Sequence, residues 1–203
     1  EATLIEPVAC CIRAMRKCDV QPSDTIAIIG AGPSGIINTM LFKNSNARKV
    51  IVSDIIDYRL KMAERLGADL TINSRNENFV QKLRNATDGR GADLVIVTAP
   101  SVEAFSEAIQ VCRRGGTLCL FAPLSPEVQV PISPHRLFFS EITVVPSYSA
   151  SHVETRMALE LISSGRIRAK ELITHCFQLT QVQEAFKTAA KSRECLKVVI
   201  TNE

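Results

Sequence analysis

The sequence has little net charge, no basic stripe with interleaved aromatic residues and no unbroken membrane-length apolar run. The net charge is only +3 over 203 residues, which gives no reason to expect nucleic acid as a partner. Residues 25–42 carry no charge and are long enough to cross a bilayer. Three glycines, Pro33, Ser34 and Asn38 interrupt them, so a strand, a turn and a helix are predicted there, and no membrane partner.

Cysteine and histidine patterns typical of a metal site are also missing. The seven cysteines are odd in number and none forms a C-x-x-C pair, while the three histidines are isolated. Neither pattern has the spacing of zinc ligands. No signal peptide is visible at the start of the sequence. We therefore expect free thiols, a reducing compartment, a cytoplasmic location and no zinc site built from this chain alone.

A glycine-rich turn is the most informative motif. Residues 24–29 form a short apolar run typical of a buried parallel strand, and a helix is predicted to begin at Ile36. Between them, Gly30, Gly32 and Gly35 have the spacing G-x-G-x-x-G, with Pro33 and Ser34 inside it. Such a turn allows a tight bend, a close backbone approach to a pyrophosphate and close packing of helix on strand. The helix N-terminus then favours an anion.

An acidic residue at the expected distance strengthens this interpretation. Residues 49–54 form a second buried strand that ends in Asp54, 19 residues after Gly35. A carboxylate at this point can accept hydrogen bonds from the ribose hydroxyls of a dinucleotide. The alternative is a tight turn followed by an unrelated helix-capping Asp.

Alternating strands and helices predict an α/β fold, a Rossmann doubly wound sheet of six parallel strands. Further strands are expected at residues 69–73, 93–98, 117–121 and 141–145, with a turn at 113–116 and a Pro-rich loop at 122–134. Helices are expected at 6–18, 57–66, 78–86 and 101–112. Residues 151–154 form a capping box, and Thr180 with Gln183 predicts a second one. The sheet does not need the tail that ends in a strand at 196–200.

At this point the residues resemble a family, the zinc-containing medium-chain dehydrogenases, and within it the polyol and threonine dehydrogenase branch. The resemblance covers nearly the whole chain and rests on residues 5–10, 30–35, 89–93, 114–116 and 172–175, with Asp54 and Arg59. It implies three parts: a connecting helix at 1–20, an NAD-binding domain at 21–148, and a tail at 149–203. The tail would return to a GroES-like catalytic domain that this chain lacks.

The resemblance implies NAD lying across the carboxyl ends of the strands. It assigns cofactor contacts to the glycine turn, Asp54 and Arg59. It also assigns contacts near the nicotinamide to the residues that follow three of the strands, namely Thr98, Ala99, Pro100, Phe121, Ala122, Pro123, Ser147 and Tyr148. Small residues and prolines are also common where strands enter loops, so a structural role remains an alternative for each of these.

The resemblance also gives Glu6 a role as a catalytic and metal-binding residue, which holds zinc directly or through a water molecule. Its other ligands would lie in the absent domain. Without the resemblance, Glu6 is better explained as an acid at the positive end of a helix. A catalytic zinc needs three protein ligands, so we expect this chain to be inactive alone.

In full-length form the resemblance implies an NAD-dependent oxidoreductase that oxidises a secondary alcohol, such as a polyol, a sugar alcohol or threonine, by hydride transfer with zinc. A homo-oligomer, dimer or tetramer, is expected through the edge of the sixth strand. Two alternatives remain: a zinc-independent quinone or enoyl reductase, and a nucleotide-binding module without catalysis. Asp54 and Glu6 disfavour the first, and a tail shaped to pack on another domain disfavours the second.

Overall fold

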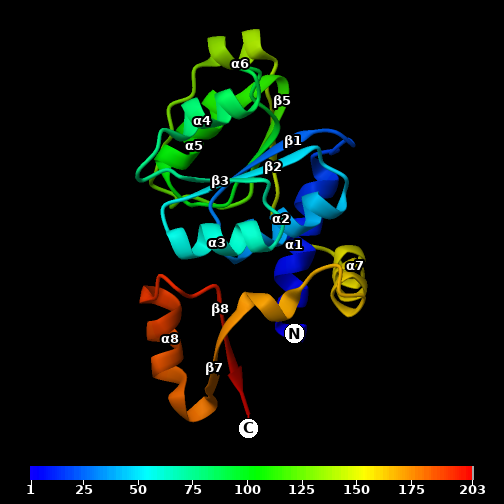
Figure 1. Cartoon of the computed structure of the whole chain (residues 1–203), viewed down its shortest axis with the longest axis vertical. Helices are drawn as coiled ribbons and strands as arrows, with labels where there is room; N and C mark the ends of the chain where they lie inside the picture. The colour runs from blue at the N-terminus through cyan, green and yellow to red at the C-terminus, as the bar shows by residue number, and fades with distance from the viewer. Residues whose placement is uncertain (203) are drawn as a thin grey trace.

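A six-stranded, fully parallel sheet forms the centre of the molecule (Figure 1). The structure is a computed structural model that describes residues 1–202. The strands lie in the order β3-β2-β1-β4-β5-β6. Their bounds are β1 Thr25–Ile29, β2 Lys49–Asp54, β3 Leu70–Asn73, β4 Ala92–Val97, β5 Cys112–Leu120 and β6 Thr143–Pro146. The order reverses between β1 and β4, which confirms the doubly wound fold.

Helices cover both faces of the sheet. Successive side chains of a strand point to opposite faces, so a strand made of apolar residues needs packing partners on both sides. Ile26 and Ile28 of β1 pack with residues of α1 (Ile5–Lys17), α2 (Pro33–Asn44) and α3 (Asp57–Arg65). Ala27 and Ile29 face the other way, towards α4 (Phe79–Ala86) and α5 (Val102–Val111). All five residues of β1 are buried, as expected for a parallel strand covered on both sides.

The second helix begins earlier than predicted. Gly32 is the N-cap of α2 and Pro33 is its first residue, whereas the sequence had indicated a start at Ile36. Proline fits the first helical turn because its fixed φ is helical and its missing N–H needs no partner there. Ser34 and Gly35 therefore belong to the helix, so part of the glycine motif is helical.

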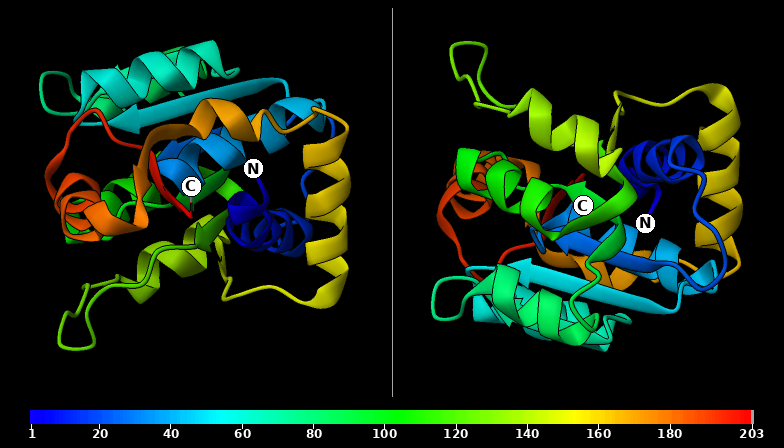
Figure 2. Two further views of the ribbon diagram at one scale, coloured as in Figure 1. Left: turned by 90° about the horizontal axis from the view of Figure 1, so that it is seen from below. Right: turned by 90° about the horizontal axis from the view of Figure 1, so that it is seen from above.

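Two elements near β5 differ from the prediction. Residues 113–116, expected to form a turn, lie within β5, whose pairing with β4 shifts register between Ala92 and Leu94. The expected Pro-rich loop ends in an additional helix, α6 (Pro134–Ser140), where the Ser133 hydroxyl accepts a hydrogen bond from the Arg136 N–H. This helix has only 7 residues and buries none of them, so it is too short for an apolar period to reveal it in the sequence. Figure 2 shows the preceding loop projecting from the body.

The chain after β6 forms α7 and a separate tail. Helix α7 (His152–Ser163) begins at the predicted capping box of Ser151 and Glu154 and lies beside α1 (Figure 2). Ala158 and Ile162 enter the same core cluster as Val8. The tail holds a second, two-stranded parallel sheet of β7 (Ile173–Gln178) and β8 (Lys197–Thr201), with α8 (Val182–Lys191) packed on it.

Short 3-10 helices complete the chain, with bounds η1 Ala2–Leu4, η2 Ala169–Leu172 and η3 Leu179–Gln181. The second capping box was predicted at the wrong residues: it joins Gln178 to Gln181, not Thr180 to Gln183. All seven cysteines are free. No helix among the described residues is long and apolar enough to cross a membrane.

Candidate functional site

The glycine turn joins β1 to α2 and leaves no room for side chains at two of its positions. Gly30 has φ +106°, and a Cβ there would lie 2.7 Å from the Thr98 hydroxyl. A Cβ on Gly35 would lie 1.9 Å from the carbonyl oxygen of Gly30. Thr98 itself fastens the turn, because its hydroxyl donates to the Gly30 carbonyl at 2.8 Å. Gly30 and Gly35 are thus required by packing inside the protein.

Gly32 is different because the space in front of it is open. A Cβ built on Gly32 would meet no atom within 4 Å, and its φ of −67° is accessible to any residue. No side chain caps this end of α2, and its first turn carries no acid. The partial positive charge and free N–H groups of a helix N-terminus therefore face open space. This cradle has the shape and polarity to hold a phosphate-type anion.

Asp54 lies at the carboxyl end of β2 and is 9% exposed. Its Oδ2 accepts a hydrogen bond from the Ala31 N–H at 2.7 Å, and its Oδ1 accepts one from the Ile56 N–H at 2.9 Å. The carboxylate is thereby held against the glycine turn. Arg59 approaches from α3, with its Nη1 3.9 Å from Oδ2 of Asp54. The buried Nε of Arg59 has no hydrogen-bond partner in the described chain, so a polar ligand could still bind it.

A cavity of about 550 Å³, here called the acidic cavity, lies beside Asp54. Its lining residues are Ile29, Gly30, Ser53, Asp54, Ile55, Ile56, Arg59, Ser74, Ala99, Pro100, Ser101, Glu103, Ala104 and Glu107. Three of them are carboxylates and one is a cation. Burial, together with the charge of Glu103, raises the pKa of Glu107.

The sequence did not predict the part of this cavity that comes from β3 and α5. Ser74 follows β3, and Glu103 and Glu107 lie in α5, which follows β4. Two of the lining residues had a local signal in the sequence: Ser74 comes directly after β3, and Ser101 caps the start of α5. The position of α5 next to Asp54 had none, since it depends on β4 pairing with β1.

A second cavity, of about 330 Å³ and here called the Glu6 cavity, is built from four parts of the chain. Its lining residues are Glu6, Pro7, Cys10, Ser34, Phe121, Ser147, Tyr148 and Ser149. The structure thus brings Glu6 together with the predicted Phe121, Ser147 and Tyr148. Ser34 at the start of α2 lines this cavity and Gly30 lines the acidic one, so the glycine turn lies between the two. The buried Ser147 hydroxyl has no partner in the described chain.

Four other predicted residues take different places. Ala99 and Pro100 line the acidic cavity with Asp54 and not the Glu6 cavity, and their predicted contact with the nicotinamide end stays a prediction. Ala122 and Pro123 line neither cavity. Ala122 instead continues the sheet by donating its N–H to the Val97 carbonyl at 2.9 Å. The residues that follow the parallel strands all lie at the same edge of the sheet, but they line different cavities there or none.

Glu6 lies exposed in the first turn of α1. The Cys10 thiol donates to its Oε1 at 3.1 Å. Burial, followed by the hydrogen bond to Glu6 and its charge, raises the pKa of Cys10 to about 11, so the thiol stays protonated at neutral pH. No group of three His, Cys, Asp or Glu side chains within residues 1–202 could hold a metal ion. Zinc therefore does not fit the ligand set of this chain by itself.

Comparison of the chain with known protein families gives a match that covers most of its length. The family model described as "Zinc-binding dehydrogenase" matches residues 33–164. The chain belongs to the zinc-binding dehydrogenase family. This membership confirms the resemblance found in the sequence, and the matched range includes Asp54 and, of the glycine turn, residues 33–35.

Individual members of this zinc-binding dehydrogenase family extend the match over nearly the whole chain. Sorbitol dehydrogenase from Bacillus subtilis is 32% identical over 98% of this chain and 56% of its own length. D-arabinitol dehydrogenase 1 from Uromyces fabae is 31% identical over 98% and 58%. A putative zinc-binding dehydrogenase from Sinorhizobium meliloti, solved bound to NADP, superposes with a TM-score of 0.91 at 26% identity, over 98% and 58%. This chain therefore spans a little over half the length of these relatives.

Proposed function

We propose that this chain is the NAD-binding part of a zinc-type dehydrogenase that oxidises a secondary alcohol, such as a polyol. The observation that carries the proposal is the open cradle at Gly32, with one cavity on each side of it. A dinucleotide has this layout, since its diphosphate joins two nucleosides. When bound, a nicotinamide cofactor supplies hydride transfer, and the chain supplies binding and orientation.

Each part of the site has a role towards such a cofactor. The N-terminal amides of α2 would bind the diphosphate. The Asp54 carboxylate, held by two backbone N–H groups, would accept hydrogen bonds from the adenosine ribose in the acidic cavity. The Glu6 cavity would then receive the nicotinamide end, where the unpaired Ser147 hydroxyl offers a polar contact.

The charges of the acidic cavity favour NAD over NADP. NADP carries an additional phosphate on the adenosine ribose, where Asp54, Glu103 and Glu107 face only one cation, Arg59. Two like unit charges 4 Å apart repel by about 4 kcal/mol at an effective dielectric constant of about 20. Arg59 offsets part of this repulsion, but it is already 3.9 Å from Asp54. The S. meliloti relative was solved with NADP, so cofactor selection is the point to test.

The names of relatives support a polyol or a similar alcohol as substrate: the B. subtilis and U. fabae proteins are named for sorbitol and D-arabinitol. For the full-length protein we propose Glu6 as a residue beside the zinc. The described residues do not form a metal site by themselves. We also propose a homo-oligomer, because β6 ends the sheet with one edge unpaired.

The test is a titration of the chain with NADH and NADPH, followed by nicotinamide fluorescence. We expect NADH to bind at least about tenfold more tightly, because the repulsion above exceeds the 1.4 kcal/mol that corresponds to one decade. Equal or tighter binding of NADPH would contradict the preference, and binding of neither cofactor would contradict the proposed function.

The variant Asp54→Asn tests whether Asp54 is the residue that selects NADH over NADPH. Removing the charge is expected to weaken NADH binding and to reduce the NADH preference by about tenfold. Glu160→Gln on α7, an exposed acid far from both cavities, is the control and should leave the preference unchanged. Melting curves of both variants show whether each is folded under the binding conditions.

A further inference from the structure

A third cavity, of about 590 Å³, is lined by an unusual number of arginines. We call it the arginine cleft. Its lining residues are Arg84, Gly89, Arg90, Ile109, Cys112, Arg113, Arg114, Arg136 and Ser140. Five of the nine are cations and none is an acid.

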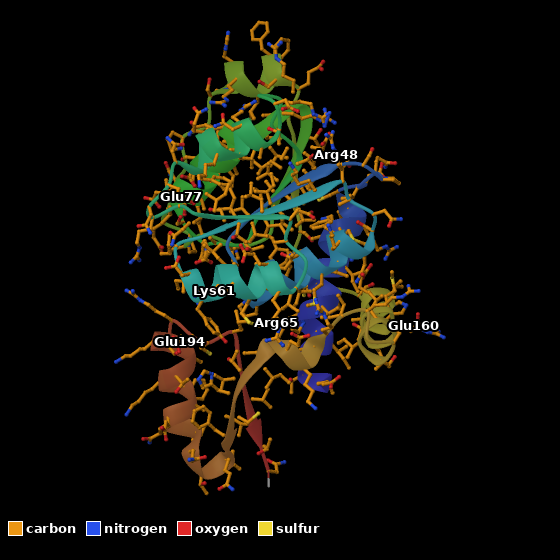
Figure 3. All side chains as sticks on the ribbon, in the orientation of Figure 1. Arg48, Lys61, Arg65, Glu77, Glu160 and Glu194 are labelled. Carbon is orange, nitrogen blue, oxygen red and sulfur yellow. The ribbon has the colours of Figure 1, made fainter. Side chains whose placement is uncertain are left out.

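The arginine cleft and the glycine turn lie at opposite edges of the sheet. Cys112 and Arg113 begin β5, whereas the glycine turn and Asp54 follow the ends of β1 and β2. Because all strands are parallel, their beginnings share one edge and their ends the other. Figure 3 marks these edges: Arg48 precedes β2 at one, and Glu77 follows β3 at the other. A ligand in the cleft would not touch the proposed cofactor site.

Two arginines are fixed by the end of α5. Arg84 donates to the carbonyls of Gly89, Arg90 and Gln110, the last at 2.6 Å. Arg136 donates through Nη2 to the Ile109 carbonyl at 3.3 Å. These bonds satisfy carbonyls that a helix C-terminus leaves without partners. They also hold both guanidinium groups in place.

Two more arginines share one carboxylate. Arg90 and Arg113 both donate to Oδ1 of Asp93, while Oδ2 of Asp93 accepts the Thr25 N–H at 2.8 Å. Burial raises the pKa of Asp93, but the hydrogen bonds from Arg90, Thr25 and Arg113 outweigh it and lower the value to about 2. Asp93 is therefore charged at neutral pH. It neutralises one of the two cations.

The remaining positive charge has no partner within the described chain. The Arg114 side chain is exposed and makes no hydrogen bond or ion pair there, although the Arg114 carbonyl accepts from Nη1 of Arg113. Nη1 of Arg90, Nη2 of Arg113 and Nη1 of Arg136 also lack partners. With Asp93 and with Asp24, whose charge also acts on Arg90, five arginines leave an excess of three charges around the cleft. The whole chain also carries +3, so its other charges balance.

We propose that the arginine cleft binds a compound with two or three linked phosphate groups. Guanidinium groups bind phosphate oxygens with two parallel hydrogen bonds, and those fixed by other contacts lose little side-chain entropy on binding. A cavity of about 590 Å³ is in the usual range for a small ligand. No aromatic side chain lines it, so single-stranded nucleic acid would find no stacking surface there.

The test is a calorimetric titration of the chain with tripolyphosphate at low salt, with ATP in a parallel arm. The variant Arg114→Gln removes a guanidinium that makes no hydrogen bond or ion pair in the described chain, so it should fold normally, as a melting curve can check. Losing one charge-assisted contact should weaken binding about tenfold. Arg156→Gln on α7, which pairs only with Glu160 in the described chain, is the control and should bind as the unchanged chain does.

A second arm separates the cleft from the cofactor site. Tripolyphosphate should bind equally well when NADH is saturating. If NADH does not bind the chain at all, the tripolyphosphate titration still measures binding at the cleft. Tighter binding of either tripolyphosphate or ATP would identify a free polyphosphate or a nucleotide as the ligand. Displacement by NADH, unchanged affinity in Arg114→Gln, or no binding would each overturn the proposal.

Discussion

At the scale of single residues, Gly32 and Gly35 are glycines for different reasons. Gly35 is required inside the protein, because a Cβ there would lie 1.9 Å from the Gly30 carbonyl oxygen. Gly32 faces open space, and its φ of −67° suits any residue. A Cβ on Gly32 would therefore occupy only the space that we assign to the diphosphate.

We accordingly predict opposite effects of two alanine substitutions. Gly35→Ala should lower the free energy of unfolding by about 3 kcal/mol, since overpacking forces backbone shifts. Gly32→Ala should change it by less than about 1 kcal/mol and still weaken NADH binding at least about tenfold. Urea unfolding and the NADH titration measure both quantities. Unchanged NADH binding by Gly32→Ala would show that the cofactor does not use this cradle.

At the scale of elements, α7 is attached to α1 through its own N-terminus. Glu154 is 3% exposed and closes the capping box by accepting from the backbone N–H of Ser151 at 2.9 Å. The same carboxylate forms ion pairs with Arg16 and, at 3.6 Å, with Arg13, both on α1. The capping residue of one helix is thus also the contact to another.

This arrangement predicts a pH-dependent effect of Glu154→Gln. Hydrogen bonds from the Ser151 side chain and backbone lower the pKa of Glu154 to about 2, with Arg16 adding to them. A carboxyl with a pKa lowered by folding stabilises the protein above its unfolded value of about 4.3 and loses this effect as the pH falls towards 2. Glu154→Gln should therefore lower the melting temperature most at pH 7.

Melting curves between pH 7 and pH 3 test this expectation. The stability difference between Glu154→Gln and the unchanged chain should fall to about half or less at pH 3. Glu160→Gln lies on the same helix but 69% exposed, so its effect should be small at every pH. A stability difference between Glu154→Gln and the unchanged chain that stays constant with pH would mean that packing, and not the charge of Glu154, holds α7 against α1.

At the scale of the whole molecule, α6 and the tail each expose large apolar side chains. Phe138 and Phe139 of α6 are 76% and 59% exposed, in the helix that precedes the unpaired edge strand β6. Phe186 of α8 is 70% exposed and Leu179 is 60% exposed in the tail. Large exposed apolar residues often mark interaction surfaces. The proposed oligomer would use the first of these surfaces, and a catalytic domain would cover the second.

We predict that Phe138→Asp shifts the chain to monomer, with its dimer dissociation constant raised at least about tenfold. Phe186→Asp, an equally exposed aromatic residue on the other surface, should leave the dimer unchanged. Sedimentation velocity over a range of concentrations measures both. Dissociation by Phe186→Asp but not by Phe138→Asp would place the interface on the tail instead.

The sequence by itself determined the local chemistry of this protein. The glycine turn between a strand and a helix, the strand that ends at Asp54, the alternation of apolar strands with helices and the capping box at Ser151 were all predicted correctly. Each depends on residues close together in the chain, whose spacing is fixed by the geometry of a turn, strand or helix. Helix α6 escaped prediction because its 7 residues are too few to show a helical period in the sequence.

Only the tertiary structure decided which residues share a cavity. The reversal of strand order between β1 and β4 brings α5, with Glu103 and Glu107, next to Asp54 and moves Ala99 and Pro100 to the same place. The arginine cleft likewise combines ends of elements that are distant in sequence. Parallel strands meet through long crossovers, so neighbours at an edge of the sheet depend on strand order, which no local pattern contains.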